Sequence, residues 1–250
     1  MKTVKKVLDI LEAFERPKIE LGISELVRLS GLNTSTVYRI CSDLAQRGYL
    51  ERVKGRGKYC LGQRFLRFYD PLNEIARLKD VALVFMQKLS RDIDESVTLS
   101  VRAGNELSDI ACVVSSQKLQ LISREGEILP LHCTSAGKIF LAQMDSDNLR
   151  IVLGNKGLPA RTTNTITDLN LLNKELGIVR REGIAFDDEE YETGIRSIAA
   201  QVKGKDGIVI AALAVVGPSV RISVQKMREL IPVIKTCSMK ISRALGYQGA

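Results

Sequence analysis

The sequence predicts an α+β protein with two domains joined by a helix. Apolar residues recur at helical spacing near the N-terminus and again in residues 72–91. Beyond residue 95, alternating runs separated by glycine turns indicate antiparallel strands. A length of 250 residues also suits two domains of roughly 100–200 residues each. We therefore expect an N-terminal domain in residues 1–70, a linker helix in residues 71–92 and a C-terminal domain in residues 93–250.

The composition is that of an ordinary globular protein. Hydrophobic residues make up 45% of the chain and charged residues 26%, so disorder is not expected. No apolar run approaches the roughly 18 residues that a membrane span requires. Asp9, Glu12 and Glu15 interrupt the basic and apolar N-terminus, which favours an amphipathic helix over a signal peptide. We expect no membrane partner.

The cysteines are widely spaced, their number is odd, and no CxxC pair occurs. Neither a disulfide framework nor a zinc ribbon fits this pattern. We therefore expect a reducing, cytoplasmic location. We also expect no metal site and no cofactor. The five cysteines are Cys41, Cys60, Cys112, Cys133 and Cys237.

Positive charge is concentrated in the expected N-terminal domain. Residues 1–70 hold 14 Lys and Arg against 8 Asp and Glu, whereas the rest of the chain holds 23 against 21. Charge of one sign gathered in one segment indicates that this segment binds a polyanion. Nucleic acid is the leading candidate, followed by an acidic membrane surface.

Three helices are expected in the N-terminal domain. Residues 3–15 carry one apolar stripe, and a second helix is expected to start at the N-cap Ser24 and end at Gly31. The third helix should run over residues 34–47 with Asn33 as its cap. The order of these helices, the third following a tight turn after the second, is that of a helix-turn-helix.

A basic hairpin is expected to follow the third helix. Residues 49–62, YLERVKGRGKYCLG, alternate on both sides of a loop with two glycines, which predicts two paired strands. No acidic residue lies between Arg52 and Arg67. Together with the three helices, this hairpin predicts a winged helix-turn-helix. One helix fits the B-DNA major groove, about 12 Å wide, while the hairpin neutralises phosphates.

We expect the partner to be a double-stranded DNA operator. Ser35, Thr36 and Arg39 are the candidates for base readout, because small hydroxyls allow close approach and arginine can bond guanine O6 and N7 together. Tyr38 is expected to contact phosphate. The alternative is a structural helical subdomain with a solvated basic hairpin. The whole predicted interface comprises Asn33, Thr34, Ser35, Thr36, Tyr38, Arg39, Arg52, Lys54, Arg56 and Lys58.

The C-terminal domain is expected to mix antiparallel strands with helices. Paired strands joined by short glycine turns are the main signal, with Asp206-Gly207 the strongest of these turns. The expected elements are strands at 96–104 and 106–114 joined at Gly104-Asn105, a strand pair within 119–133 turning at Glu125-Gly126, two strands within 195–218, and helices at 134–144, 168–183 and 223–244.

Four stretches of the chain resemble the IclR family of bacterial and archaeal transcriptional regulators. They are LGISELVRLSGLNTSTVYRICSDLAQRGYLER, LPLHCTSAGKIFLA, RTTNTITDLNLLNKELGIVRREGIAFDDEEYETGIRSIAA and GIVIAALAVVGPSVRI. The resemblance covers nearly the whole chain. It implies a sequence-specific DNA-binding regulator with a GAF-like C-terminal domain that binds a small-molecule effector, frequently a carboxylate metabolite. It also implies a homodimer or a dimer of dimers, and we favour a repressor over an activator.

The stretch LPLHCTSAGK suggests where the effector binds. If Thr134 or Ser135 caps the following helix, the backbone N–H groups of Ser135, Ala136 and Gly137 face outward and can bind an anion. The alternative is an ordinary capped helix packed on a sheet. The resemblance favours the anion site, since Ser135 and Ala136 match the family's pocket segment.

Other matched positions suggest what kind of effector fits. Ser197 stands where many family members have cysteine, and Ala214 and Val216 stand where members that bind small 2-oxo acids have serines. The loss of two hydroxyls predicts a bulkier, more apolar ligand, namely an aromatic or longer-chain carboxylate. The effector site that the resemblance implies comprises Thr134, Ser135, Ala136, Gly137, Asp187, Ser197, Ala214 and Val216.

An enzyme is the main competing class, and we expect none. His132 and Cys133 could suggest a Cys–His dyad, but on the expected strand adjacent side chains point to opposite faces. Lys138 follows a glycine but lacks the earlier glycine of a phosphate-binding loop. The acidic residues 187–190 could hold a hard cation, although a solvated or capping loop, with Arg196 paired to it, is the commoner structure.

An architectural DNA-binding protein without an effector is the third class. Such a protein would not need a nearly neutral second domain. We expect dimerisation through residues 3–15 and 72–91, whose apolar stripes exceed what one small domain can bury. A two-fold dimer would then present two recognition helices to half-sites about 34 Å apart.

Overall fold

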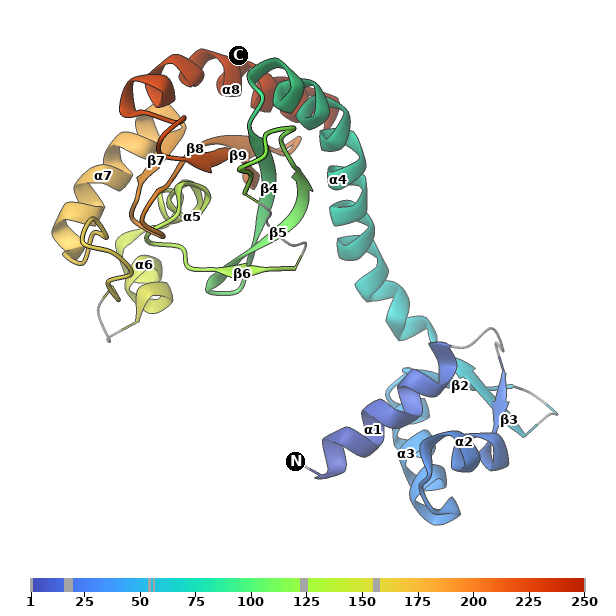
Figure 1. Cartoon of the computed structure of the whole chain (residues 1–250). Helices are drawn as coiled ribbons and strands as arrows, with labels where there is room; N and C mark the ends of the chain where they lie inside the picture. The colour runs from blue at the N-terminus through green and yellow to red at the C-terminus, as the bar shows by residue number, and fades with distance from the viewer. Residues whose placement is uncertain are drawn as a thin grey trace. The chain divides into compact units, whose positions relative to one another are not determined.

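The computed structural model confirms the predicted α+β class and resolves the chain into two compact units, residues 1–74 and 75–250. Each unit is described here by itself (Figure 1). For Lys2 and residues 66–73 only the backbone is described. The described residues are 2–15, 20–53, 55, 57–121, 126–154 and 158–249.

The N-terminal unit packs three helices against a small antiparallel sheet. Its core joins Ile10, Leu26 and Val37 from the helices with Leu50 and Tyr59 from the sheet. The strands lie in the order β1-β3-β2. The helices are α1 (Lys2–Glu12), η1 (Ala13–Glu15), α2 (Ile23–Ser30) and α3 (Thr34–Gln46), and the strands are β1 (Leu21–Gly22), β2 (Leu50–Val53) and β3 (Lys58–Leu61).

The start of α2 corrects one prediction. Ser24 does not cap this helix: the cap is Gly22, whose N–H donates to Glu25 Oε2 at 3.0 Å. Gly22 is held in an extended conformation because it pairs with Lys58 in the sheet, so the chain turns into the helix directly after the strand. The predicted end at Gly31 is confirmed, since this residue has φ 67°, a conformation that favours glycine.

The C-terminal unit is built on a six-stranded sheet in the order β6-β5-β4-β9-β8-β7, with every neighbouring pair antiparallel. Its strands are β4 (Ser96–Ala103), β5 (Glu106–Val113), β6 (Ile128–Leu129), β7 (Ile184–Asp188), β8 (Ile195–Lys203) and β9 (Val209–Pro218). The helices are α4 (Leu66–Ile93), which begins in the N-terminal unit, α5 (Ser135–Leu141), α6 (Ser146–Leu153), α7 (Leu169–Glu182) and α8 (Val224–Ala244).

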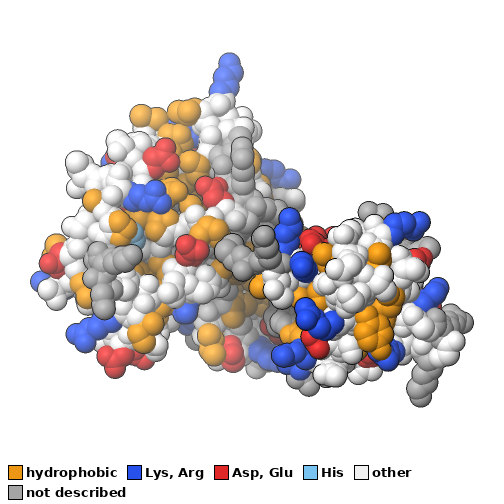
Figure 2. Space-filling model, turned by 90° about the horizontal axis from the view of Figure 1, so that it is seen from below, with side chains coloured by type: hydrophobic (Ala, Val, Ile, Leu, Met, Phe, Trp, Pro, Cys, Tyr) orange, Lys and Arg blue, Asp and Glu red, His pale blue; other side chains and the backbone are white. Residues whose placement is uncertain are grey.

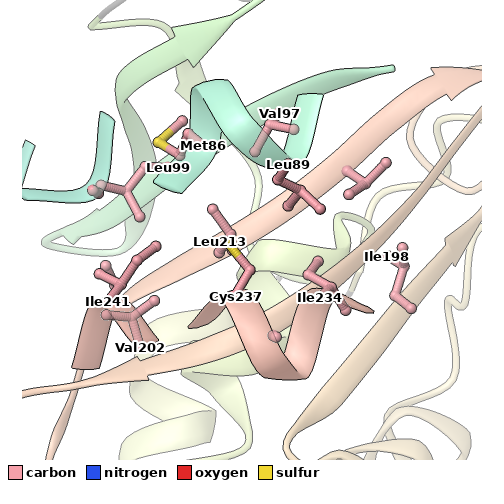
Figure 3. Packing of buried hydrophobic residues seen from close by; sticks show 14 of the residues in the cluster. Met86, Leu89, Val97, Leu99, Ile198, Val202, Leu213, Ile234, Cys237 and Ile241 are labelled. Atoms are coloured by element: carbon pink, nitrogen blue, oxygen red, sulfur yellow. The ribbon is translucent and has the colours of Figure 1, made fainter. Parts of the chain in front are cut away.

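Helices cover both faces of this sheet (Figure 1). The apolar stripes of α4 and α8, which include Met86, Leu89, Ile234 and Cys237, pack on one face of the sheet. Figure 3 shows these side chains converging with Leu213 and other strand residues in one layer. Helices α5, α6 and α7 pack on the opposite face. Since successive strand residues point to opposite faces, β9 contributes to both layers.

Several boundaries differ from the expected ones. Helix α4 begins at Leu66, directly after the 3₁₀ turn at residues 63–65, so Pro71 lies within the helix and removes one N–H donor instead of opening it. Strands β1 and β7 and helix α6 were not predicted. Of the strand pair expected within 119–133, the described residues form only β6, while Glu125 lies outside them. None of the described helices is long and apolar enough to cross a membrane.

Candidate nucleic-acid interface and ligand pocket

The N-terminal end of α3 presents polar side chains to solvent. Ser35 and Arg39 are exposed and lie four residues apart, so they share one face of the helix. Asn33 and Thr34 are also exposed, and Thr36 is half-buried. Asn33 caps the helix as predicted, because its Oδ1 accepts the N–H of Thr36 at 2.8 Å and the Ser35 hydroxyl at 3.0 Å. The surface that the sequence predicted for base readout is therefore outward and pre-ordered.

The opposite side of α3 anchors the helix in the core. Val37, Ile40, Cys41 and Leu44 are buried there, as their helical spacing predicted. Burial raises the pKa of the Cys41 thiol to about 11, so this cysteine stays an uncharged core side chain.

The Arg52 side chain links α3 to the hairpin. Its Nε donates to Tyr59 Oη at 2.9 Å, and its Nη2 donates to Tyr38 Oη at 3.3 Å. The guanidinium carbon lies 5.7 Å from the Tyr38 ring centroid and 5.5 Å from the Tyr59 ring centroid, within cation–π range. Tyr38 is 53% exposed, so this bridge holds an accessible phenol beside Arg39.

The rest of the predicted wing is only partly described. Lys58 is half-buried on β3, whereas Lys54 and Arg56 lie outside the described residues. Gly55 and Gly57 flank the tip with φ 75° and 59°, values that favour glycine and permit the tight turn. In Figure 2, blue Lys and Arg side chains are spread over the visible face of the smaller unit, at the right of the view.

The C-terminal unit contains a cavity of about 190 Å³ between the sheet and α5. Of the eight residues expected to bind an effector, seven line this cavity although they come from four separate segments of the chain. Strands β7, β8 and β9 bring Asp187, Ser197, Ala214 and Val216 beside the start of α5, because their pairing places Ser197 opposite both Asp187 and Val216. The seven residues are Thr134, Ser135, Ala136, Asp187, Ser197, Ala214 and Val216.

Gly137 does not line the cavity, which corrects the prediction that its N–H faces a ligand. That N–H donates instead to Thr134 Oγ1 at 3.2 Å, so Thr134 is the helix cap. Gly137 packs against the preceding turn so closely that a Cβ atom there would lie 2.2 Å from the carbonyl oxygen of Leu131. The backbone N–H groups of Ser135 and Ala136, at the first turn, have no acceptor within the helix.

Buried hydroxyl groups connect α5 to Asp187. Ser135 Oγ and Ser197 Oγ lie 2.7 Å apart, and Ser197 Oγ lies 3.4 Å from Asp187 Oδ2. Asp187 Oδ1 accepts the N–H of Glu190 at 2.8 Å and of Tyr191 at 3.3 Å. Burial raises the pKa of the Asp187 carboxyl to about 7, so its charge changes near neutral pH.

The titration of Asp187 also affects stability. The pKa of an aspartate in an unfolded chain is near 4, so the folded state binds this proton more tightly than the unfolded state does. The stability that this residue contributes is therefore fully present below about pH 4 and is lost as the pH rises through 7.

The sequence reasoning missed the part of the cavity that the other half of the sheet supplies. Thr98 and Ser100 on β4 alternate with buried Val97 and Leu99, and this polar alternation reads as a solvent-facing side. In the folded unit it faces the cavity, and Ser100 donates to Asp109 Oδ1 at 2.5 Å. Additional lining residues are Leu107, Asp109, Leu121, Glu127, Leu129, Tyr191, Glu192 and Ile195.

A buried ion cluster anchors α5, the helix whose first turn lines the cavity. The Lys138 side chain on α5 is fully buried, and its Nζ donates to Glu175 Oε1 at 2.6 Å, to the carbonyl of Phe186 at 3.0 Å and to Glu190. The cluster therefore joins α5 to α7 and to the segment that follows β7. Burial raises the pKa of Glu190, and the neighbouring Lys138 ammonium opposes this shift.

Comparison with known proteins identifies both units. Residues 3–54 match the family model described as the IclR helix-turn-helix domain, and residues 74–243 match the model described as Bacterial transcriptional regulator IclR C-terminal. The second match alone covers more than half of the chain. The chain belongs to the IclR family. It is accordingly a DNA-binding transcriptional regulator of a family that is not enzymatic.

Individual relatives match this IclR-family chain over nearly its whole length. It is 32% identical to the HTH-type transcriptional regulator KdgR of Escherichia coli, over 98% of this chain and 93% of the relative. It is 27% identical to the Acetate operon repressor of Salmonella typhimurium, over 98% and 90%. A solved IclR homologue from Microbacterium hydrocarbonoxydans, complexed with 4-hydroxybenzoate, superimposes with a TM-score of 0.65 at 26% identity, over 97% of this chain and 98% of that one.

The geometry around His132 and Cys133 agrees with a non-enzymatic IclR-family domain. These residues lie in a turn and not on a strand, so the strand argument used for the sequence was wrong. The ring Nε2 of His132 is 2.9 Å from the carbonyl oxygen of Pro159, and burial lowers the pKa of the ring. Burial raises the pKa of the Cys133 thiol to about 12, which keeps it from acting as a thiolate.

The acidic run does not form a metal site within the described part of the chain, where no group of three or more metal-binding side chains occurs. Asp187 is buried and faces the cavity. Arg196 pairs with the run as expected: its Nε lies 2.5 Å from Asp188 Oδ1 and its Nη2 lies 3.0 Å from Glu189 Oε1. The guanidinium of Arg196 thus neutralises two of the four carboxylates without a metal ion.

Proposed function

We propose that this IclR-family regulator is a repressor that reads its operator through Ser35, Thr36 and Arg39 and releases or tightens that contact when a carboxylate binds in the cavity of the C-terminal unit. The observation that carries the DNA-binding part is the two-sided character of α3. One side is buried in the core, and the other exposes Ser35 and Arg39 beside a basic hairpin.

The exposed residues differ in what they can recognise. Arg39 has the planar fork that bonds guanine O6 and N7, whereas Ser35 and Thr36 are short enough to let the helix approach the bases closely. Lys58 and the neighbouring wing residues Lys54 and Arg56 supply charge for phosphates, a contact without sequence information. Arg52 is committed to Tyr38 and Tyr59, so we assign it the task of holding Tyr38 toward the DNA backbone.

Two substitutions separate these tasks. Arg39→Ala is expected to weaken operator binding by about 1–3 kcal/mol, because the contact between Arg39 and one operator base is lost. Binding to random DNA should stay nearly unchanged. Lys58→Ala is expected to weaken operator and random DNA equally and to reduce the log–log salt slope by about one unit. The measurement is fluorescence anisotropy with duplexes that the wild-type protein selects from a random library, at several salt concentrations.

Lys226→Ala is the matched control, because it removes an exposed lysine from the C-terminal unit. It should change neither the affinity nor the slope. If Arg39→Ala binds the selected duplex as tightly as wild type, Arg39 plays no part in base readout. Selection that yields no common sequence would instead support an architectural protein over a regulator of one operator.

The proposal of an effector rests on the cavity. Ala136, Ala214 and Val216 contribute apolar lining, while Ser135 and Ser197 contribute two adjacent hydroxyl groups. The backbone N–H groups of Ser135 and Ala136 add donors for a carboxylate. Since the relative from Microbacterium hydrocarbonoxydans is complexed with 4-hydroxybenzoate, we expect an aromatic or longer-chain carboxylate here as well. The relative named as an operon repressor supports repression.

A thermal-shift screen tests the effector proposal. A carboxylate present at 100 times its dissociation constant should stabilise the C-terminal unit by about 2.7 kcal/mol. The panel includes 4-hydroxybenzoate, straight-chain fatty acids of increasing length and small 2-oxo acids. A ligand counts as an effector only if it also changes operator affinity in the anisotropy assay. A ligand that binds the DNA-competent and the alternative conformation equally well does not change the equilibrium between them. Tight binding of small 2-oxo acids would contradict the size prediction.

Dimerisation is part of the proposed function. In α1, Val4 is 64% exposed and Leu8 is 49% exposed, and these residues lie one turn apart on the same side of the helix. In α4 much of the expected apolar stripe packs on the sheet of the same chain, which corrects that part of the expectation, but Val84 is 68% exposed. A second copy of the chain that covers α1 and α4 would bury these side chains and would set two recognition helices at a fixed spacing, about 34 Å or a multiple of it. A dimer of dimers would extend the same contacts.

A further inference from the structure

The cavity poses an electrostatic problem for the ligand that we propose. Among its described lining residues, no side chain is Lys, Arg or His. Its acidic lining residues are Asp109, Glu127, Asp187 and Glu192. A bound carboxylate would place a second negative charge beside Asp187, which is buried. Two carboxylates that share a poorly solvated site raise each other's affinity for a proton.

Asp187 is the lining carboxyl group best placed to take up that proton. It is only 3% exposed, and it lies at the end of the hydroxyl series Ser135–Ser197–Asp187. Its Oδ1 is occupied by two backbone N–H groups, which leaves Oδ2 directed at Ser197. The other titratable or charged groups around it are Lys138 on α5, Cys133 before α5, the lining residues Asp109 and Glu127, the segment Glu190, Tyr191 and Glu192 after β7, and Arg161, which stacks on the Tyr191 ring.

The direction of the hydroxyl series depends on this carboxyl group. When Asp187 is ionised it only accepts, so Ser197 donates to Asp187, Ser135 donates to Ser197, and Ser135 offers lone pairs to the cavity. When Oδ2 carries a proton, it donates to Ser197, Ser197 donates to Ser135, and the Ser135 hydroxyl is free to donate into the cavity. Only the second arrangement suits a ligand carboxylate, which has acceptors alone.

We propose that the cavity binds a carboxylate ligand together with one proton, which is taken from solvent and held on Asp187. This inference rests on the proposed function, since it concerns the ligand of the same cavity. In this proposal, Asp187 and Ser197 determine whether the Ser135 hydroxyl donates or accepts a hydrogen bond in the cavity. Burial raises the pKa of Asp187 to about 7 in the free protein, so proton uptake should accompany binding above that pH.

Matched acid and amide ligands test the proposal on the full chain. The probes are benzoate with benzamide, cinnamate with cinnamamide, and hexanoate with hexanamide, titrated at pH 6, 7, 8 and 9. The affinity of an acid should fall about ten-fold per pH unit above 7, as expected for uptake of one proton. The affinity of its amide, which can donate and accept, should not change. Calorimetry at pH 8.5 in phosphate and in Tris should give uptake of about one proton per bound acid.

Two variants complete the test. Asp187→Asn keeps an oxygen for the N–H groups of Glu190 and Tyr191 and supplies a permanent donor toward Ser197, so acid binding should become independent of pH and proton uptake should vanish. Glu192→Gln is the matched control, since it removes a negative charge from the cavity lining without touching the hydroxyl series. It should strengthen acid binding at every pH and leave the ten-fold slope intact.

The possible results separate this inference from the function on which it rests. Acid binding that is independent of pH in the wild type, or a slope that persists in Asp187→Asn, overturns the proton inference and leaves the effector proposal standing. If none of the acids binds at any pH while an amide does, the cavity takes a neutral ligand, and both the carboxylate proposal and the proton inference are wrong.

Discussion

Replacing Lys138 with alanine should lower the free energy of unfolding of the C-terminal unit by about 3–5 kcal/mol. The side chain is fully buried and bonds to Glu175, to the carbonyl of Phe186 and to Glu190. Its removal leaves the Glu190 carboxylate buried without its cation, and Glu190 Oε2 already has no hydrogen-bond partner among the described residues. Breaking one side of a buried ion pair costs more than the pair itself contributes, because the remaining charge stays desolvated.

Urea denaturation followed by circular dichroism measures this effect. The matched control is Lys88→Ala, which breaks an ion pair with Asp92 in which the two side chains are 68% and 53% exposed. An exposed pair of this kind contributes about 0.5 kcal/mol or less. The loss caused by Lys138→Ala should also be smaller at pH 5 than at pH 8, since burial raises the pKa of Glu190 and protonation removes its charge. Equal losses from the two lysine variants would contradict the importance of the buried cluster.

Gly137→Ala should destabilise the C-terminal unit by about 1–3 kcal/mol and also abolish the response to the effector. The added Cβ would meet the backbone of Leu131, with 2.2 Å to its carbonyl oxygen and 2.5 Å to its Cα. Backbone atoms cannot rotate away, so α5 must shift relative to the turn before it. Such a shift moves Ser135 and Ala136, which line the cavity, although Gly137 itself does not.

Gly177→Ala supplies the comparison. Gly177 lies in the middle of α7, is exposed, and would place its Cβ where no atom lies within 4 Å. Alanine is the better helix former by roughly 0.5–1 kcal/mol, so this variant should be more stable than the wild type. Thermal unfolding of the two variants should therefore shift in opposite directions. If Gly137→Ala has the melting temperature of the wild type, the backbone at Leu131 can move to accommodate the Cβ at little cost, which would contradict this prediction.

The N-terminal unit was largely predictable because its determinants are local. The buried stripe of α3, its Asn33 cap and the turn at Gly31 each depend on residues within one or two helical turns. Three features were misjudged: the start of α2, the short strand β1 and the start of α4 at Leu66. At the start of α2, Gly22 is held by a strand pairing with Lys58, a contact that spans 36 positions and that no local pattern reveals.

The ligand cavity was predictable only through the family resemblance. The run containing Asp187 and Asp188 reads as solvated, yet β7 pairs with β8 and places Asp187 opposite Ser197 inside the unit. Thr98 and Ser100 likewise look solvent-facing in the sequence, because alternation of polar and apolar residues does not show that a helix will cover the polar face of the strand. In both cases the position of a polar side chain is decided by tertiary packing, which a one-dimensional pattern does not contain.

The bridge from Arg52 to Tyr38 and Tyr59 has a consequence for the cost of association with DNA. Because two phenol rings hold one guanidinium, the hairpin strand and the proposed recognition helix α3 are coupled before any partner binds. The rotamer entropy of these three side chains is then lost when the chain folds and not when the complex forms. An interface ordered in advance in this way should associate without a slow rearrangement step, so that recognition is limited by encounter and orientation alone.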